Sequence, residues 1–163
     1  MMGSGKSTVG AALAARTGDA FVDLDAAIVA DAGRSIAELF ASEGEAGFRA
    51  RETQTLARVL ASPRSCVLAC GGGVVLRDEN VALLRERATV VWLDATVETL
   101  AARVGDGAGR PLLAGDPAAR LASLDAQRRH RYAACADVVV AVDGRSVDEI
   151  VDALAGALAE VPA

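Results

Sequence analysis

The amino-acid sequence predicts an α/β fold, a three-layer sandwich in which a parallel sheet lies between two layers of helices. Short apolar runs alternate with amphipathic segments along the whole chain, as in folds built from strand–helix units. The chain also opens with Met-Met-Gly-Ser-Gly-Lys-Ser-Thr, the pattern of a phosphate-binding loop that leads directly into a helix. At 163 residues the chain fits one domain, which we expect to cover residues 1–163.

The first half of the chain is predicted to contain helices and two strands. In order, we expect a helix over residues 6–17, a strand at 20–24, a helix through Ile28 to Gly33, a helix starting at Ser35, a longer helix from a break at 42–45 to about Ala61, and a strand at 65–70. The signals are local, because Gly18 supplies a C-cap and Ser35 with Glu38 forms a capping box. Both strands are short apolar runs.

The second half repeats the alternation. We expect, in order, a helix over 78–87, a strand at 89–93, a helix from Thr96 to Val104, a glycine-rich loop at 105–116, a helix from Pro117, a strand at 137–142 and a closing helix from Ser146. Thr96 is an N-cap residue, and Ser146 with Glu149 forms a second capping box. Strands that alternate with helices in this way predict a parallel sheet.

One strand that this fold needs is missing from the sequence. A phosphate loop connects a buried strand to its helix, and too few residues precede Gly3 to form that strand. The strand would lie in the middle of the sheet, and its absence leaves buried backbone groups unpaired at about 1–3 kcal/mol each. We therefore expect the native product to begin upstream of Met1. An intact mass that starts at Met1 in a folded native protein would contradict this expectation.

Composition and charge exclude several classes of protein. Apolar residues make up 52% of the chain and aromatic residues only 3%, so the expected core is aliphatic. The net charge of −5 argues against a nucleic-acid partner, which would need a basic face. No apolar run reaches the roughly 18 residues of a membrane span, and the first residues lack a signal-peptide pattern. Cys66, Cys70 and Cys135 are odd in number and lack metal-ligand spacing, so we expect reduced core thiols in a cytoplasmic protein. We also expect a monomer without a membrane partner.

The opening residues carry the first candidate site. In a phosphate loop the glycines let backbone N–H groups point at phosphate oxygens, and the helix N-terminus adds a favourable dipole. Lys6, the only lysine in the chain, would reach the outer phosphates, and the Ser7 hydroxyl would bind Mg²⁺. The alternative is a flexible N-terminal tag, which the capped helix that follows disfavours.

Two acidic residues, Asp23 and Asp25, stand at the carboxyl end of a predicted strand, where open α/β sheets bind ligands. We expect alternation along an extended segment to send both side chains to the same side. One carboxylate would then support the Mg²⁺ shell, while the other would meet an acceptor hydroxyl. The alternative makes Asp25 a plain cap of the next helix.

Gly71-Gly72-Gly73 and several arginines complete the candidate set. Three glycines remove every Cβ and would let a small ligand lie against backbone N–H groups, although a flexible turn is the alternative. Arg49 and Arg128 suit a carboxylate, which arginine binds through two parallel hydrogen bonds. Arg110 suits a mobile lid over a transferring phosphate. Surface ion pairs are the alternative for these arginines, and the preferred interpretation for Arg51, Arg129 and Arg131.

Taken together and in this order, the motifs resemble those of shikimate kinases. The motifs are Gly3-Ser4-Gly5-Lys6-Ser7-Thr8, Asp23-x-Asp25, Gly33-Arg34-Ser35-Ile36, Gly44-Glu45-x-x-Phe48-Arg49-x-x-Glu52, Gly71-Gly72-Gly73 and Arg110-Pro111-Leu112-Leu113. The resemblance covers almost the whole chain. It implies a nucleoside-monophosphate-kinase-like fold with strand order 2-3-1-4-5, here without its first strand. It also implies transfer of the ATP γ-phosphoryl group to the 3-hydroxyl of shikimate, with Mg²⁺, in aromatic amino-acid biosynthesis.

The resemblance assigns roles residue by residue. It implies catalysis by Lys6, Asp25 and Arg110, and a metal site at Ser7 and Asp23. ATP would contact Gly3, Ser4, Gly5, Lys6, Ser7, Thr8, Arg103, Arg110 and Arg145. Shikimate would contact Asp25, Arg49, Gly71, Gly72, Gly73 and Arg128, with substrate-binding helices at about 33–61 and a lid at about 105–116.

Two departures and two rival functions accompany the resemblance. Cys70 stands where many members have threonine before the triple glycine, and a thiol is a weaker hydrogen-bond partner. The alignment at Arg128 depends on Tyr132, so Arg129 is an alternative carboxylate ligand. The rival functions are another small-molecule kinase of this fold, for gluconate or a nucleoside monophosphate, and a truncated nucleotide-binding module without turnover.

Overall fold

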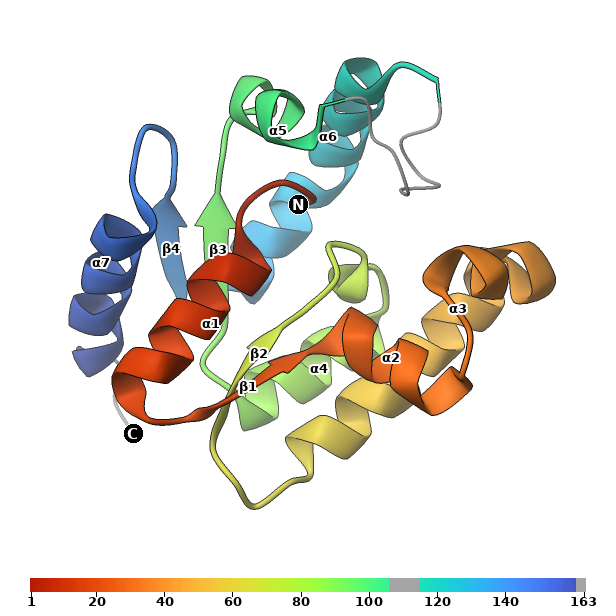
Figure 1. Cartoon of the computed structure of the whole chain (residues 1–163), viewed down its shortest axis with the longest axis horizontal. Coiled ribbons are helices and arrows are strands. Elements are labelled where there is room, and N and C mark those ends of the chain that lie inside the picture. Colours follow the sequence, from red (N-terminus) through yellow and green to blue (C-terminus); the bar gives the residue numbers. More distant parts are fainter. Residues whose placement is uncertain (106–114, 161–163) are drawn as a thin grey trace.

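Strands and helices alternate along the chain as the sequence predicts, in a computed structural model that describes residues 1–105 and 115–160 (Figure 1). The elements are α1 (Lys6–Thr17), β1 (Ala20–Asp23), α2 (Leu24–Ala32), α3 (Ile36–Leu60), β2 (Cys66–Ala69), the short 3₁₀ helix η1 (Val74–Leu76), α4 (Asp78–Arg87), β3 (Val91–Asp94), α5 (Val97–Val104), α6 (Pro117–Cys135), β4 (Val138–Ala141) and α7 (Val147–Ala159). Most of the predicted lid at 105–116 lies outside the described residues. Arg110 lies outside them as well.

The predicted capping residues lie at the ends of the helices, as expected. Gly18 adopts φ 79° and its N–H donates to the Ala14 carbonyl, which closes α1. Both predicted capping boxes are present, at the starts of α3 and α7. Helix α3 runs through the predicted break but is kinked there, because Gly44 has φ 68° and ψ −179°. A side chain at that φ would be strained, so the glycine permits the kink.

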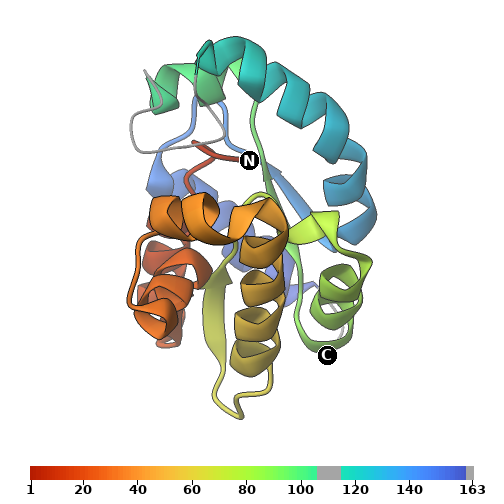
Figure 2. The ribbon, with the colours of Figure 1, turned by 90° about the vertical axis from the view of Figure 1, so that its right-hand side faces the viewer.

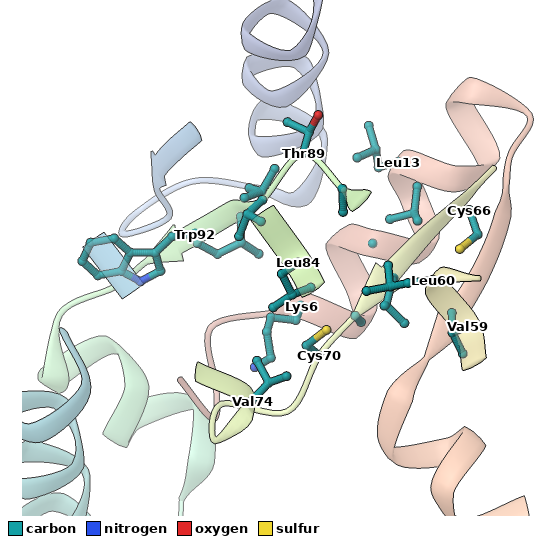
Figure 3. Close-up of a pocket in the computed structure, with 18 of the residues that line it drawn as sticks. Lys6, Leu13, Val59, Leu60, Cys66, Cys70, Val74, Leu84, Thr89 and Trp92 are labelled. Carbon is teal, nitrogen blue, oxygen red and sulfur yellow. The ribbon is translucent and has the colours of Figure 1, made fainter. Parts of the chain in front are cut away.

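The strands are parallel, as the sequence predicts, and form two separate pairs in the described part of the chain. In one sheet β1 pairs with β2, with Ala20 opposite Cys66. In the other, β3 pairs with β4, with Val91 opposite Val138. A cavity of about 710 Å³ lies between the two pairs and is lined by residues of both β2 and β3 (Figure 3). The described residues therefore leave one edge of β2 and one edge of β3 without a neighbouring strand.

Helices cover the strands on both sides (Figures 1 and 2). Helix α1 packs against β1, β2 and α7, whereas α4 packs against α3 and α6. The core is aliphatic, as the composition predicts, with Leu24, Leu39, Leu56, Leu100 and Leu121 fully buried. Each such leucine stabilises the fold by roughly 1.5–3 kcal/mol. None of the described helices combines the length and apolarity that a bilayer crossing needs.

Candidate active site

The opening residues form a tight loop whose amides surround the start of α1. Gly3 and Gly5 have φ 78° and 89°, a region that side chains rarely adopt, and α1 begins directly after Gly5. The buried Ser4 hydroxyl donates to the Met1 carbonyl at 2.9 Å, and Lys6 Nζ donates to the same carbonyl at 2.6 Å. The loop therefore places Lys6 at the N-terminus of a 12-residue helix, an arrangement that favours a bound anion.

The acidic pair lies next to this loop, but not in the predicted conformation. Strand β1 ends at Asp23, and Asp25 belongs to the first turn of α2, so alternation along an extended segment does not place the two side chains. Asp23, rather than Asp25, is the helix cap, because its Oδ1 accepts from Asp25 N at 3.0 Å and Ala26 N at 3.2 Å. Its other oxygen accepts from the Ser7 hydroxyl at 2.6 Å. This hydrogen bond joins the acidic pair directly to the start of α1.

Asp25 lies in a partly buried position that changes its acidity. Burial is the main cause that raises the pKa of Asp25, and the negative charge of Asp23 adds to it, while Lys6 and Arg49 act in the opposite direction. A Cβ placed on Gly71 would lie 3.1 Å from Asp25 Oδ1 and 3.2 Å from Glu52 Oε1. The Asp25 carboxyl therefore faces bare backbone in a site of reduced polarity, where it can accept a hydrogen bond from a hydroxyl.

Arg49 is held in place by two carboxylates of its own helix. Its Nη1 donates to Glu52 Oε2 at 2.8 Å and to Oε1 at 3.0 Å, while Nη2 lies 3.3 Å from Glu45 Oε1. Glu52 has no exposed surface and Arg49 is 8% exposed. Burial raises the pKa of Glu52, although the facing Arg49 lowers it. The sequence motifs assign no role to Glu52, although its spacing of three residues from Arg49 was the available signal.

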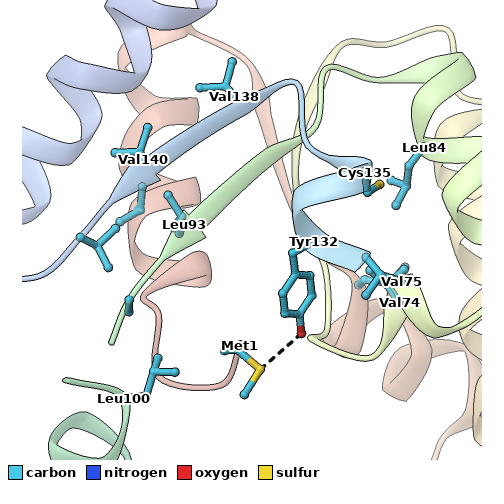
Figure 4. Close-up of a cluster of buried hydrophobic side chains, with 14 of the residues drawn as sticks. Met1, Val74, Val75, Leu84, Leu93, Leu100, Tyr132, Cys135, Val138 and Val140 are labelled. Carbon is cyan, nitrogen blue, oxygen red and sulfur yellow. Dashed lines mark hydrogen bonds between the residues drawn. The ribbon is translucent and has the colours of Figure 1, made fainter. Parts of the chain in front are cut away.

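The contacts of the glycine turn, residues 71–73, explain why it consists of three glycines. A Cβ on Gly73 would overlap the Arg49 guanidinium, and one on Gly72 would lie 3.2 Å from the Tyr132 hydroxyl. Tyr132 donates to the Gly72 carbonyl at 2.5 Å and approaches Met1 Sδ at 3.4 Å (Figure 4). Each glycine thus faces a different polar or charged side chain from elsewhere in the chain, and Tyr132 ties α6 to the glycine turn.

The residue before the turn, Cys70, cannot act as a thiolate at neutral pH. Burial raises the pKa of its thiol to about 12, and the neighbouring Glu52 carboxylate adds to the shift. The three cysteines Cys66, Cys70 and Cys135 are all free thiols, as expected.

Arg128 and Arg129 have different surroundings on α6. Arg129 is fully engaged, because its Nε donates to Asp125 at 2.9 Å, its Nη1 donates to Asp94 at 3.1 Å, and its guanidinium lies over the Trp92 ring. Arg128 is only 4% exposed, and its Nε has no hydrogen-bond partner among the described residues. An unpartnered buried donor is costly, at about 1–3 kcal/mol, unless a ligand satisfies it. The geometry therefore favours Arg128 as the anion ligand.

The other described arginines that the sequence singled out divide into two groups. Arg103 donates from Nη1 to Gly3 O at 3.5 Å and from Nη2 to Val142 O at 3.2 Å, so it lies between the loop and the end of β4. Arg145 donates to Ala141 O at 3.4 Å beside the same strand end. Arg51 pairs with Glu43, and Arg131 contacts Val75 O and Asp78, which agrees with their predicted structural roles.

The donors next to the loop fit a magnesium ion bound together with phosphate. The described residues contain no group of three acidic, histidine or cysteine side chains that would cage a metal by themselves. Ser7 and Asp23, 2.6 Å apart, supply one hydroxyl and one carboxylate. Mg²⁺ is commonly held by one or two carboxylates together with substrate phosphates and water, so this small set suits it.

Comparisons with known proteins give one consistent result. The family model described as shikimate kinase matches residues 2–159. A shikimate kinase of Symbiobacterium thermophilum is 51% identical over 154 residues, which cover 93% of this chain and 88% of the relative. A shikimate kinase of Salinispora arenicola is 48% identical, with 96% and 93% covered.

Solved structures agree with the sequence comparisons. A shikimate kinase from Acinetobacter baumannii in complex with shikimate superposes with a TM-score of 0.93 at 33% identity, covering 97% of this chain and 88% of the other. The shikimate kinase of Aquifex aeolicus superposes with a TM-score of 0.85 at 31% identity, covering 98% and 92%.

Proposed function

Because this chain belongs to the shikimate kinase family, we propose that its site transfers the γ-phosphoryl group of ATP to the 3-hydroxyl of shikimate. The chain is accordingly an ATP-dependent transferase of aromatic amino-acid biosynthesis. The resemblance inferred from the sequence motifs is confirmed by the family match.

The observation that supports this reaction most directly is that the anion-binding loop, the acidic pair and Arg49 come together at one edge of the strands. The anion-binding loop is joined to Asp23 through Ser7, and Asp25 responds to both Lys6 and Arg49. A phosphate donor and a carboxylated cyclic alcohol can therefore meet over the same few residues. This arrangement also argues against a nucleotide-binding module without turnover, because such a module has no use for Arg49 and the glycine turn.

The charge of each residue indicates which part of the reaction it serves. The transition state of phosphoryl transfer is loose and anionic, so preorganised cations and N–H donors stabilise it most. We assign Lys6 and the loop amides to the transferring phosphate, and Ser7 with Asp23 to Mg²⁺, which would neutralise developing charge when bound. Asp25 orients the acceptor hydroxyl and takes its proton. Arg49 and Arg128 hold the shikimate carboxylate from two helices.

An ADP-release assay with shikimate, gluconate and CMP tests the assignment. We expect release above the background ATPase rate with shikimate alone. Faster release with gluconate or CMP would favour a different small-molecule kinase of this fold. Tight ATP binding without release on any of the three would favour a nucleotide-binding module.

We expect activity to fall on the acid side at a pH above the ordinary 3.8 of an aspartate, because burial raises the pKa of Asp25. The sign follows from the shift: a raised pKa keeps the carboxyl protonated up to a higher pH, and the proton acceptor is lost as pH falls through that value. The measurement is kcat/KM for shikimate against pH. The residual activity of Asp25→Asn should lack this acid limb, and a limb that persists there would assign it to another group.

Replacing Arg128 and Arg129 separately should give opposite patterns. We expect Arg128→Gln to raise KM for shikimate by about 10–100-fold, which corresponds to losing a charge-assisted hydrogen bond. Arg129→Gln should leave that KM within about threefold and lower Tm slightly, because a pair with a partly exposed arginine contributes about 1 kcal/mol at most. Steady-state kinetics and thermal unfolding on both variants measure this. A KM effect confined to Arg129→Gln would move the carboxylate site by one residue.

Gly73→Ala should weaken shikimate binding and leave nucleotide binding unchanged. The added Cβ would overlap the Arg49 guanidinium, so Arg49 would have to leave its position. We expect KM for shikimate to rise about 10–100-fold, with KM for ATP unchanged. Gly156→Ala is the matched control, because a Cβ there meets nothing within 4 Å on helix α7. Equal KM values in both variants would mean that the turn does not position Arg49.

The finer features of the prediction fit this assignment. We propose the strand order 2-3-1-4-5 for the sheet. In this order strands 2 and 3 correspond to the pair β1 and β2, and strands 4 and 5 correspond to the pair β3 and β4. Strand 1 of the order falls between β2 and β3. We also propose that residues 1–163 act as one domain, with substrate-binding helices at about 33–61 and a lid at about 105–116 that carries Arg110. A cytoplasmic monomer that uses ATP with Mg²⁺ completes the proposal.

A further inference from the structure

The glycine turn lies between the two helices that carry the arginines assigned to the shikimate carboxylate. At one end of the turn, a Cβ on Gly73 would overlap the Arg49 guanidinium of α3. At the other end, the Gly72 carbonyl accepts a hydrogen bond of 2.5 Å from the Tyr132 hydroxyl of α6. Arg128 belongs to the same helix as this tyrosine. The turn therefore contacts both arginine-bearing helices.

Side chains from two helices fix the backbone that follows the turn. Asn80 Nδ2 donates to the Val74 carbonyl at 3.0 Å, and Arg131 Nη1 donates to the Val75 carbonyl at 2.8 Å. Asn80 has no exposed surface, and η1 packs against both α4 and α6. Because these carbonyls and that of Gly72 are each held, the turn is a fixed reference for the side chains that contact it.

The Tyr132 hydroxyl has one proton to donate, and the Gly72 carbonyl receives it. A carbonyl oxygen only accepts hydrogen bonds, so the hydroxyl must be the donor, and its lone pairs stay available to another donor. The contact with Met1 Sδ at 3.4 Å involves a much weaker acceptor. The hydroxyl oxygen is therefore free to accept from a nearby cation.

Arg128 is the donor placed to use those lone pairs. It precedes Tyr132 by four residues on α6, which puts both side chains on one helix face, and both residues are buried. Burial raises the pKa of the Tyr132 hydroxyl, whereas the charge of Arg128 and a hydrogen bond from it act in the opposite direction. Since Arg128 Nε has no partner among the described residues, the tyrosine holds part of the guanidinium and leaves a donor for an anion.

The ring of Tyr132 is held independently of its hydroxyl. It lies 5.8 Å from the ring of Trp92 at an interplanar angle of 35°, and the Arg129 guanidinium lies over that same tryptophan. Phenylalanine would keep the ring contact and lose only the hydroxyl. A Tyr132→Phe substitution therefore isolates what the hydroxyl does.

We propose that the Tyr132 hydroxyl is a positioning group for shikimate, which holds the Arg128 guanidinium against the glycine turn at a set distance from Arg49. It acts through Arg128 rather than on the substrate. A hydrogen-bonded chain runs from Arg128 through Tyr132 to Gly72, and the same turn meets Arg49 at Gly73. One carboxylate can then accept from both arginines. The inference rests on the proposed function, because it takes shikimate as the ligand of this site.

Binding of shikimate in the absence of ATP tests the proposal. Trp92 is the only tryptophan of the chain and adjoins Tyr132, so its fluorescence is a suitable signal for a shikimate titration. We expect Tyr132→Phe to raise Kd for shikimate about 5–50-fold, the effect of losing a hydrogen bond to a charged group. His130→Gln, at an exposed position of the same helix, is the matched control and should bind shikimate as the native protein does.

A double-mutant cycle separates positioning of Arg128 from a general effect on the turn. If Tyr132 acts through Arg128, adding Tyr132→Phe to Arg128→Gln should change Kd for shikimate by less than about twofold. A general loosening of the turn would also disturb Arg49, so the tyrosine substitution would then weaken binding by its full factor in both backgrounds. Such additivity would overturn the proposal.

This proposal and the kinase assignment fail separately. If Tyr132→Phe binds shikimate as tightly as the native protein, the positioning role is wrong and the kinase assignment stands. If the native protein binds shikimate in this titration but releases no ADP with ATP present, the kinase assignment is wrong and the positioning role stands.

Discussion

Replacing Asp25 by asparagine should reduce kcat by about 100–10,000-fold, the range expected when a positioned proton acceptor is removed. Asparagine has the size of aspartate and can still accept a hydrogen bond, but it cannot take the proton of the shikimate hydroxyl. KM for ATP should change little, because the substitution leaves the loop amides and Lys6, which we assign to phosphate, unchanged. Steady-state kinetics with shikimate and ATP measure both effects.

Stability distinguishes this result from simple misfolding. Burial raises the pKa of Asp25, which means that the ionised carboxylate is disfavoured in the folded protein. A neutral side chain of the same size removes that penalty, so Tm of Asp25→Asn should be unchanged or higher at neutral pH. Asp148→Asn, at the exposed start of α7, is the matched control and should keep full activity. If kcat of Asp25→Asn stayed within about tenfold, the assigned role would be wrong.

Replacing Lys6 by methionine should reduce kcat by about 100–1,000-fold, as expected when one preorganised charge or donor at a developing anion is lost. Methionine keeps the apolar stem and removes the ammonium. The chain contains no other lysine, so no neighbouring amine can take its place. Lys6→Arg should be nearly as inactive, because a planar guanidinium cannot take the place of a compact ammonium that lies 2.6 Å from the Met1 carbonyl.

The expected loss has a clear control and a clear contradiction. Arg16→Met, on the exposed end of α1, removes a charge from the same helix and should leave turnover unchanged. Single-turnover phosphate transfer with saturating ATP separates chemistry from binding. A Lys6→Met variant that kept more than a tenth of the normal rate would show that the loop amides, rather than Lys6, carry the stabilisation.

Much of the fold could be predicted because its signals are local. The Gly18 C-cap and the Ser35 capping box act within one turn of the chain, and both are found where they were expected. The break predicted at 42–45 is a kink at Gly44 within one helix. The phosphate loop is equally local, since two positive-φ glycines and the next helix start define it. Such features depend on neighbours in sequence, which the sequence displays directly.

The candidate site was only partly predictable, because its chemistry depends on neighbours far along the chain. Residue types and order made Asp25 and Arg49 candidates, which they remain, but the prediction that both acids extend from a strand was wrong, since α2 begins at Leu24. The choice between Arg128 and Arg129 needed the positions of Asp94 and Trp92, more than 30 residues away.

By itself the sequence determined the α/β class, the phosphate loop, the helix caps and the family, because each depends on short patterns of residues. Only the tertiary structure decided that Glu52 holds Arg49, that Tyr132 holds the glycine turn, and that the described strands form two pairs around a cavity. The physical reason is that burial and strand pairing depend on which distant segments meet in space.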